Sequence, residues 1–110
     1  MQLDAFYKIK SNEERLKEAV YMVGPIAATL NAEPFQFYTG GILNPKSCGN
    51  TYFDLSHAIV LVGYGTENNI DYWIIKNSWG EKWGEKGYVR LFRGNNVCGI
   101  AIDNFTAILK

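Results

Sequence analysis

The chain has 110 residues, of which 47% are hydrophobic and 15% aromatic, so it is long enough for one compact core and too short for several. Eleven basic residues balance eleven acidic ones and are scattered along the chain, which argues against nucleic acids and membrane surfaces as partners. No apolar run approaches the roughly 18 residues of a membrane-spanning helix, and the first ten residues lack the apolar segment of a signal peptide.

The first half of the chain predicts one helix between short strands. Residues 1–10 alternate apolar and polar side chains, as a strand does. The sequence Ser-Asn-Glu-Glu from Ser11 is a helix capping box, and apolar residues then recur at helical spacing until Gly24 and Pro25 end the helix. Residues 26–30 are typical of a short buried strand, and residues 35–43 pass through a Gly-Gly turn into a brief extended segment.

The second half predicts strands. Four apolar runs, at residues 58–64, 72–76, 88–92 and 99–102, are each bounded by Gly, Asn or Asp. The predicted fold class is α+β: an antiparallel, barrel-like sheet with one N-terminal helix packed against it. No linker or repeat divides residues 1–110, so we expect a single domain.

His57 is the only histidine in the chain, and it begins an apolar run. The polar residues 65–71 predict a hairpin turn, and His57 and Asn77 are equidistant from Glu67 within it, so they should face each other across the pair. An amide oxygen bound to one ring nitrogen would fix the imidazole and leave the other nitrogen to exchange a proton with a nucleophile. The alternatives are a structural histidine with a satisfied ring and an asparagine that caps a turn.

Residues 76–91, KNSWGEKWGEKGYVRL, place two tryptophans four residues apart among glycines, which no ordinary turn requires. This segment resembles the papain and cathepsin family of cysteine proteases, which carries Asn-Ser-Trp-Gly followed by Trp-Gly and a Gly-Tyr strand. Residues 56–65 resemble the histidine strand of that family, residues 23–43 the segment before it, and residues 97–101 the closing strand. These motifs occur in the family's order and cover essentially the whole chain.

The resemblance implies a cysteine-type peptidase in which His57 is the imidazole partner of the catalytic thiolate and Asn77 orients the ring. Trp79 would lie over their contact and exclude water from it, and Trp83 would line the leaving-group side of the cleft. The alternative role of Trp79 is packing in the core, and that of Trp83 is to support the glycine-rich loop.

The resemblance also implies a specificity pocket whose wall includes Thr29, Ala58 and Ala101. These residues are small and uncharged, so the pocket would be mainly apolar and suited to Leu, Phe or Val. The alternative is that small residues beside a strand simply allow close packing.

Cys48 and Cys98 match the disulfide in the family's second half rather than its nucleophile, which lies in a Cys-Gly-Ser-Cys-Trp context roughly 130–150 residues before the histidine and asparagine. Such a bridge would stabilise the fold by about 4 kcal/mol and would imply a lysosomal or extracellular parent enzyme. Two buried free thiols, or a Cys₂His metal site that lacks a fourth ligand, are the alternatives. We expect no metal and no cofactor.

The resemblance therefore implies the C-terminal, sheet-rich half of a papain-like peptidase, a single partial domain. The thiolate would lie on an absent helical half, so we expect the chain alone to be inactive. The expected partners are that half, a peptide or protein substrate, and a propeptide or cystatin-like inhibitor. Two other classes remain open: an inactive homologue that binds peptides or inhibitors, and a remnant whose exposed apolar face drives self-association.

Overall fold

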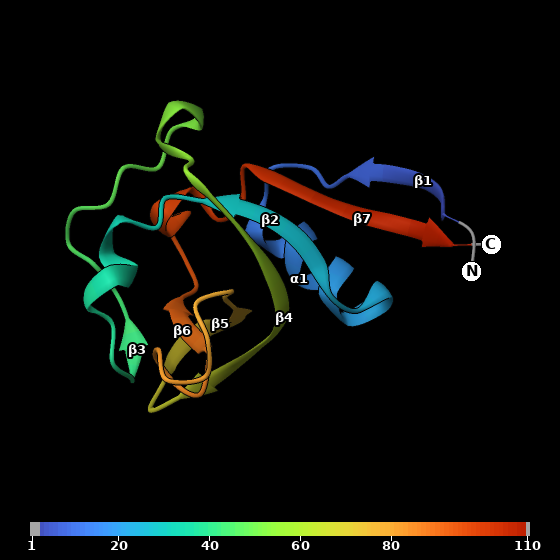
Figure 1. The fold of residues 1–110 in the computed structure, drawn as a ribbon. Coiled ribbons are helices and arrows are strands. Elements are labelled where there is room, and N and C mark those ends of the chain that lie inside the picture. The colour runs from blue at the N-terminus through green and yellow to red at the C-terminus, as the bar shows by residue number, and fades with distance from the viewer. Residues whose placement is uncertain (1–2, 110) are drawn as a thin grey trace.

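Seven strands form one sheet in the order β1-β7-β2-β4-β5-β6-β3, and helix α1 packs against β2, β4 and β7 (Figure 1). The computed structural model describes the backbone of residues 3–109 and the side chains of residues 8–106. The main elements are β1 (Leu3–Lys8), α1 (Glu13–Val23), β2 (Ile26–Leu30), β3 (Ile42–Leu43), β4 (His57–Glu67), β5 (Ile70–Lys76), β6 (Tyr88–Phe92) and β7 (Asp103–Leu109). Three short 3₁₀ turns lie between them: η1 (Glu33–Phe37), η2 (Tyr52–Asp54) and η3 (Val97–Gly99).

The sheet is mixed and open, which corrects the expectation of an antiparallel, barrel-like sheet. Its strand pairs are antiparallel except for β3 with β6, which is parallel. The connection from β2 passes through η1 and brings the two residues of β3 alongside β6 in the same direction. Because β1 and β3 lie at opposite edges, the sheet does not close on itself. The predicted combination of one α-helix with a sheet is confirmed for the described residues.

The helix begins one residue later than the capping box predicts. Asn12, rather than Ser11, is the N-cap, and its side-chain oxygen accepts hydrogen bonds from the backbone nitrogens of Glu14 at 2.8 Å and Arg15 at 3.2 Å. These bonds satisfy two of the backbone donors that a helix leaves free at its start.

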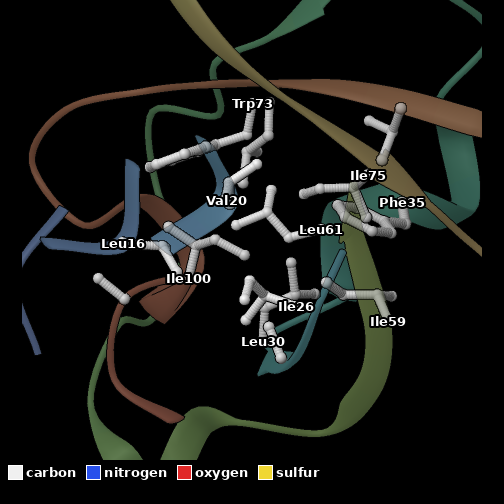
Figure 2. Packing of buried hydrophobic residues seen from close by; sticks show 14 of the residues in the cluster. Leu16, Val20, Ile26, Leu30, Phe35, Ile59, Leu61, Trp73, Ile75 and Ile100 are labelled. Atoms are coloured by element: carbon white, nitrogen blue, oxygen red, sulfur yellow. The ribbon is translucent and has the colours of Figure 1, made fainter. Parts of the chain in front are cut away.

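The core lies between α1 and the sheet, and Figure 2 shows side chains from both meeting there. Strands β2, β4, β5 and β6 contribute alternate residues, because successive side chains of a strand point to opposite faces. The helix contributes residues one turn apart. The buried core residues include Leu16, Val20, Ile26, Ala28, Leu30, Phe35, Ile59, Leu61, Trp73, Ile75, Val89, Leu91 and Ile100.

The long strand β4 connects two parts of the sheet. Its residues 57–61 pair with β2, and residues 60–67 pair with β5. An irregularity between Leu61 and Gly63 leaves one extra residue in β4 at the point where its partner changes. Figure 1 shows β4 as a strongly curved strand at this place. His57 is its first residue, so the candidate site lies at one end of the strand.

The strand predicted at residues 99–102 is wrong. Cys98 and Gly99 have φ values of 56° and 74°, in the left-handed region, so the chain turns here instead of extending. The last strand starts at Asp103.

The carboxylate of Glu13 joins the start of α1 to two other segments. Its oxygens accept hydrogen bonds from Trp73 Nε1 at 3.0 Å, from Gly94 N at 2.9 Å and from Asn96 N at 2.9 Å. The Trp73 side chain is fully buried, so its indole N–H depends on an acceptor from within the protein.

Replacing Glu13 with Ala should therefore lower the free energy of unfolding by about 3 kcal/mol, because it leaves a buried indole donor and two backbone donors without their acceptor. Urea denaturation measures this change. Glu14→Ala, which removes an exposed carboxylate from the same helical turn, is the matched control. Equal stability of the two variants would contradict the assignment.

Candidate active site

His57 is held at the first position of β4 by the strand beside it. Its residue pairs with Leu30 of β2, and the backbone nitrogen of the preceding Ser56 donates to Leu30 O at 2.9 Å. The Ser56 hydroxyl accepts a hydrogen bond from Ala32 N at 3.3 Å. These contacts fix the backbone on the N-terminal side of the imidazole, which is half-buried.

Asn77 directly follows β5 and is 6% exposed. Its backbone nitrogen donates to Gly87 O at 3.1 Å, and its side-chain Oδ1 lies 2.7 Å from His57 Nε2. Ser78 N donates to the same Oδ1 at 2.9 Å, which identifies this atom as the amide oxygen. Since an amide oxygen only accepts hydrogen bonds, Nε2 must carry the hydrogen, and Nδ1 is then free to accept a proton.

The side chains of His57 and Asn77 are in contact, but the register of β4 and β5 differs from the predicted one. The hairpin turns at Asn68 and Asn69, whose φ values are 51° and 64°, rather than at Glu67. With the extra residue in β4, the ladder ends at Val60 opposite Lys76, so its continuation would place Ile59 opposite Asn77. His57 and Asn77 therefore meet as a diagonal pair.

Two tryptophans lie on one side of the imidazole. The centroid of the Trp79 ring is 5.3 Å from that of His57, with the planes tilted by 40°. Trp83 meets Trp79 edge to face at 5.3 Å. Trp79 is 43% exposed, so it packs against the imidazole and Trp83 while part of its ring remains in solvent.

Phe35 and Tyr38 support these tryptophans, and the sequence reasoning did not single them out. Trp83 Nε1 donates to Phe35 O at 2.8 Å, and the Trp83 ring lies 5.6 Å from Phe35 and 5.4 Å from Tyr38. The aromatic-rich segment EPFQFY was a signal for such a supporting role. The sequence did not show that this segment folds into η1 and packs against the loop that carries the two tryptophans.

Two of the three predicted pocket residues pair directly across neighbouring strands. Thr29 pairs with Ala58 across β2 and β4, so these two share a face of the sheet next to His57. Ala101 is buried, with 4% exposure, and its backbone nitrogen donates to Asn96 Oδ1 at 2.9 Å. The residue that pairs with Thr29 on its other side is Asp103 of β7.

A cavity of about 480 Å³ lies on this side of the sheet. Its lining is mostly apolar and includes Ala27, Ala58, Val60 and Asn77. Asn77 Nδ2 is buried and has no hydrogen-bond partner among the described residues.

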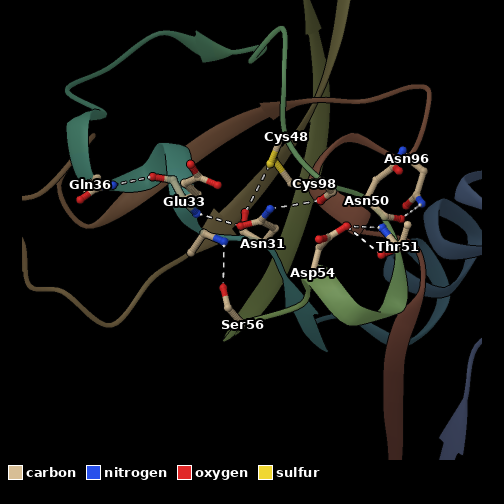
Figure 3. The surroundings of a disulfide bond; sticks show 12 residues. Asn31, Glu33, Gln36, Cys48, Asn50, Thr51, Asp54, Ser56, Asn96 and Cys98 are labelled. Carbon is tan, nitrogen blue, oxygen red and sulfur yellow. Dashed lines mark hydrogen bonds between the residues drawn. A yellow bond between two sulfur atoms is a disulfide. The ribbon is translucent and has the colours of Figure 1, made fainter.

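Cys48 and Cys98 form a disulfide, so the alternatives of free thiols and of a thiolate metal site do not describe this structure. Asn31, which follows β2, connects the two cysteine segments: its backbone nitrogen donates to Cys98 O at 2.8 Å and its Nδ2 to Gly49 O at 3.2 Å (Figure 3). Thr51 and Asp54 cap the turn η2 nearby, and the Thr51 backbone N–H lowers the pKa of the Asp54 carboxyl. The bridge thus ties the segment before His57 to η3.

Within the described residues, no helix is long and apolar enough to span a membrane. No group of three or more His, Cys, Asp or Glu side chains in that part of the chain is arranged to hold a metal ion.

Comparison with known proteins places the whole arrangement in one family. The family described as "Papain family cysteine protease" matches residues 1–108. A viral cathepsin of Spodoptera exigua nuclear polyhedrosis virus is 54% identical over 89 residues, and digestive cysteine proteinase 3 of Homarus americanus is 45% identical over 99 residues. These matches cover 81% and 87% of this chain but only 25% and 30% of the relatives, so the chain spans less than a third of their length.

Solved structures agree in fold. The structure of procathepsin L 3 from Tenebrio molitor larval midgut superimposes with a TM-score of 0.91 at 42% identity, covering 97% of this chain and 36% of that one. Bromelain from Ananas comosus, in complex with the E64 inhibitor, gives a TM-score of 0.88 at 37% identity and covers 98% of this chain and 51% of its own. The chain belongs to the papain family of cysteine proteases.

Proposed function

We propose that this chain supplies the catalytic imidazole and its orienting amide to a papain-type cysteine endopeptidase. The observation that carries the proposal is the 2.7 Å contact between His57 Nε2 and Asn77 Oδ1, which leaves Nδ1 free. In this role Nδ1 takes the proton of a thiol, and the resulting thiolate attacks the carbonyl carbon of a peptide. The imidazolium then gives the proton to the leaving amine, and water hydrolyses the acyl-enzyme.

The thiolate would come from polypeptide outside these 110 residues, because both cysteines of this chain form its disulfide. Residues 1–110 would then form one partial domain that meets a helical half. The unpaired Asn77 Nδ2 and the apolar cavity beside it support a surface that is covered by further protein. The disulfide supports a lysosomal or extracellular parent enzyme, for which a propeptide or a cystatin-like inhibitor is the proposed regulatory partner.

Trp79 would protect this chemistry. Its ring packs against the imidazole, and excluding water from the bond between Nε2 and Oδ1 would strengthen that bond. Trp83 would line the leaving-group side of the cleft, where it meets Trp79 edge to face.

The orienting role of Asn77 can be tested by NMR, since the chain has a single imidazole. We expect ring ¹⁵N shifts of the Nε2–H tautomer at high pH in the native chain, and a mixture of both tautomers in Asn77→Ala, because the acceptor for Nε2 is lost. Ser78→Ala, which keeps the backbone donor to Oδ1, is the control and should match the native chain. Unchanged ring shifts in Asn77→Ala would refute the role.

Catalysis can be tested by mixing the chain with the helical half of a cathepsin L-like relative that carries the Cys-Gly-Ser-Cys-Trp motif. We expect labelling by the epoxide E64 and hydrolysis of a fluorogenic dipeptide only in the mixture, and a loss of kcat of about a thousandfold with His57→Ala. Association of the two halves without labelling would instead identify an inactive binding homologue.

The pocket next to His57 is proposed to include Thr29, Ala58 and Ala101, with Asp103 beside Thr29 at its edge. Its apolar members suit Leu, Phe or Val, as the resemblance implies, and the Asp103 carboxylate would add affinity for a basic side chain.

In the reconstituted mixture, Asp103→Ser should lower kcat/KM about tenfold for a substrate with Arg two residues before the cleaved bond, and should leave a Leu substrate unchanged. Competing kinetics with the two substrates measures the ratio. Glu14→Gln removes a charge from the exposed side of α1 and should alter neither value. Equal losses for Arg and Leu would exclude Asp103 from the pocket.

A further inference from the structure

An ion pair beneath the tryptophans has no part in the chemistry proposed above. We infer that Glu85, paired with Arg90, is a positioning residue that holds Trp79 over His57 by way of Tyr38 and Trp83. The inference rests on the proposed function for its catalytic consequence, whereas the positioning itself concerns the described residues alone.

Glu85 binds two segments that are distant in sequence. Its Oε1 accepts a hydrogen bond from Arg90 Nε at 2.8 Å, and its Oε2 accepts from Arg90 Nη2 at 2.9 Å and from Gly41 N at 3.0 Å. The carboxylate thus joins the loop after η1, its own hairpin and strand β6. A two-point contact between a guanidinium and a carboxylate fixes orientation as well as distance.

Tyr38 links this clamp to the aromatic residues. Its hydroxyl donates to Gly41 O at 2.6 Å and accepts from Arg90 N at 3.3 Å, so it contacts both partners of Glu85. Burial raises the pKa of Tyr38, which keeps this hydroxyl a donor. The Tyr38 ring lies 5.4 Å from Trp83.

Gly84, between Trp83 and Glu85, lies in a tightly packed place. A Cβ on Gly84 would lie 2.6 Å from Tyr88 O and 3.0 Å from the Tyr38 ring, and the φ of Gly84 is 59°. Glycine here allows the backbone to approach Tyr38 closely, so movement of the Glu85 hairpin is passed to Trp83.

Trp83 then supports Trp79. Because Trp79 is 43% exposed, its position depends on few neighbours: Trp83 at 5.3 Å, Phe35 at 6.4 Å and His57 itself. Loosening Trp83 would therefore leave Trp79 free to leave the imidazole.

Arg90 also pairs with Glu67, so a substitution of Glu67 is the control for a substitution of Glu85. Glu67 lies at the end of β4, and its side chain is half-exposed. Among the described residues, its carboxylate forms a hydrogen bond with Arg90 alone. Removing either glutamate takes one carboxylate from Arg90, but only removal of Glu85 releases Gly41.

The pair should act throughout the neutral and mildly acidic range. Hydrogen bonds from Arg90 lower the pKa of the Glu85 carboxyl, so its contribution is present above the ordinary glutamate pKa and is lost only as the pH falls through the lowered value.

The test compares Glu85→Ala with Glu67→Ala in the full 110-residue chain. We expect Glu85→Ala to lose the nuclear Overhauser contacts between the imidazole and the Trp79 indole, while Glu67→Ala retains them, because the first alone frees the segment that supports Trp83. In the reconstituted mixture, Glu85→Ala should lower kcat about tenfold or more with KM little changed, as expected for a displaced catalytic group.

If Glu85→Ala fails to fold, Glu85→Gln decides the question, since it keeps one oxygen for Gly41 and replaces the charged pair with Arg90. Its contacts between indole and imidazole should weaken relative to Glu67→Gln, because Glu85 makes the two-point contact with Arg90 Nε and Nη2, whereas Glu67 binds Nη1 alone. Contacts equal to those of the native chain in a folded Glu85 variant would overturn the inference whatever the activity of the mixture. Lost contacts with no activity in any mixture would instead contradict the proposed function alone.

Discussion

The hydrogen bond between His57 and Asn77 joins two residues that lie at the ends of their strands, where backbone pairing gives them least support. A side-chain pair in such a place would be mobile unless its surroundings fixed both backbones, because ordering each residue costs conformational entropy. Here Ser56 is tied to Leu30, and Asn77 is tied to Gly87. The backbone on each side of the pair is thus fixed by a neighbour outside the pair itself.

More distant contacts also hold the segments around His57 and Asn77 in place. The disulfide and Asn31 hold the segment that leads into His57, and the aromatic residues of η1 hold the loop that follows Asn77. Both supports join segments far apart in the sequence. The site is therefore a product of tertiary structure rather than of any single hairpin.

This dependence explains what the sequence could predict. Periodicity predicted the helix and the strands of the sheet other than β7, because each pattern is local, and the family motifs directed attention to His57, Asn77 and both tryptophans. The N-cap was one residue off because Ser11 and Asn12 are both good capping residues. The strand expected at residues 99–102 failed because left-handed residues at Cys98 and Gly99 interrupt an otherwise apolar run.

The features that the sequence did not predict depend on which distant segments pair. Ala101 was expected in the pocket from its place in a motif, but only the pairing of β2 with β7 shows that Asp103 is the residue beside Thr29. Likewise, Glu85 and Arg90 look like scattered surface charges until β6 and the loop after η1 are brought together. A surface ion pair usually contributes little to stability, and its value here lies in holding a particular geometry.

The site is closed on one side and open on the other. Trp79 packs against the imidazole and is backed by Trp83 and by Phe35 of η1, whereas the cavity at Ala58 and Val60 lies open on the sheet face. In the proposed mechanism, Nε2 is the ring nitrogen whose bond to Asn77 needs protection from water, and Nδ1 is the one that a nucleophile would reach. In the proposed mechanism, proton transfer to and from an external thiol uses Nδ1, while the bond from Nε2 to Asn77 keeps the ring in place.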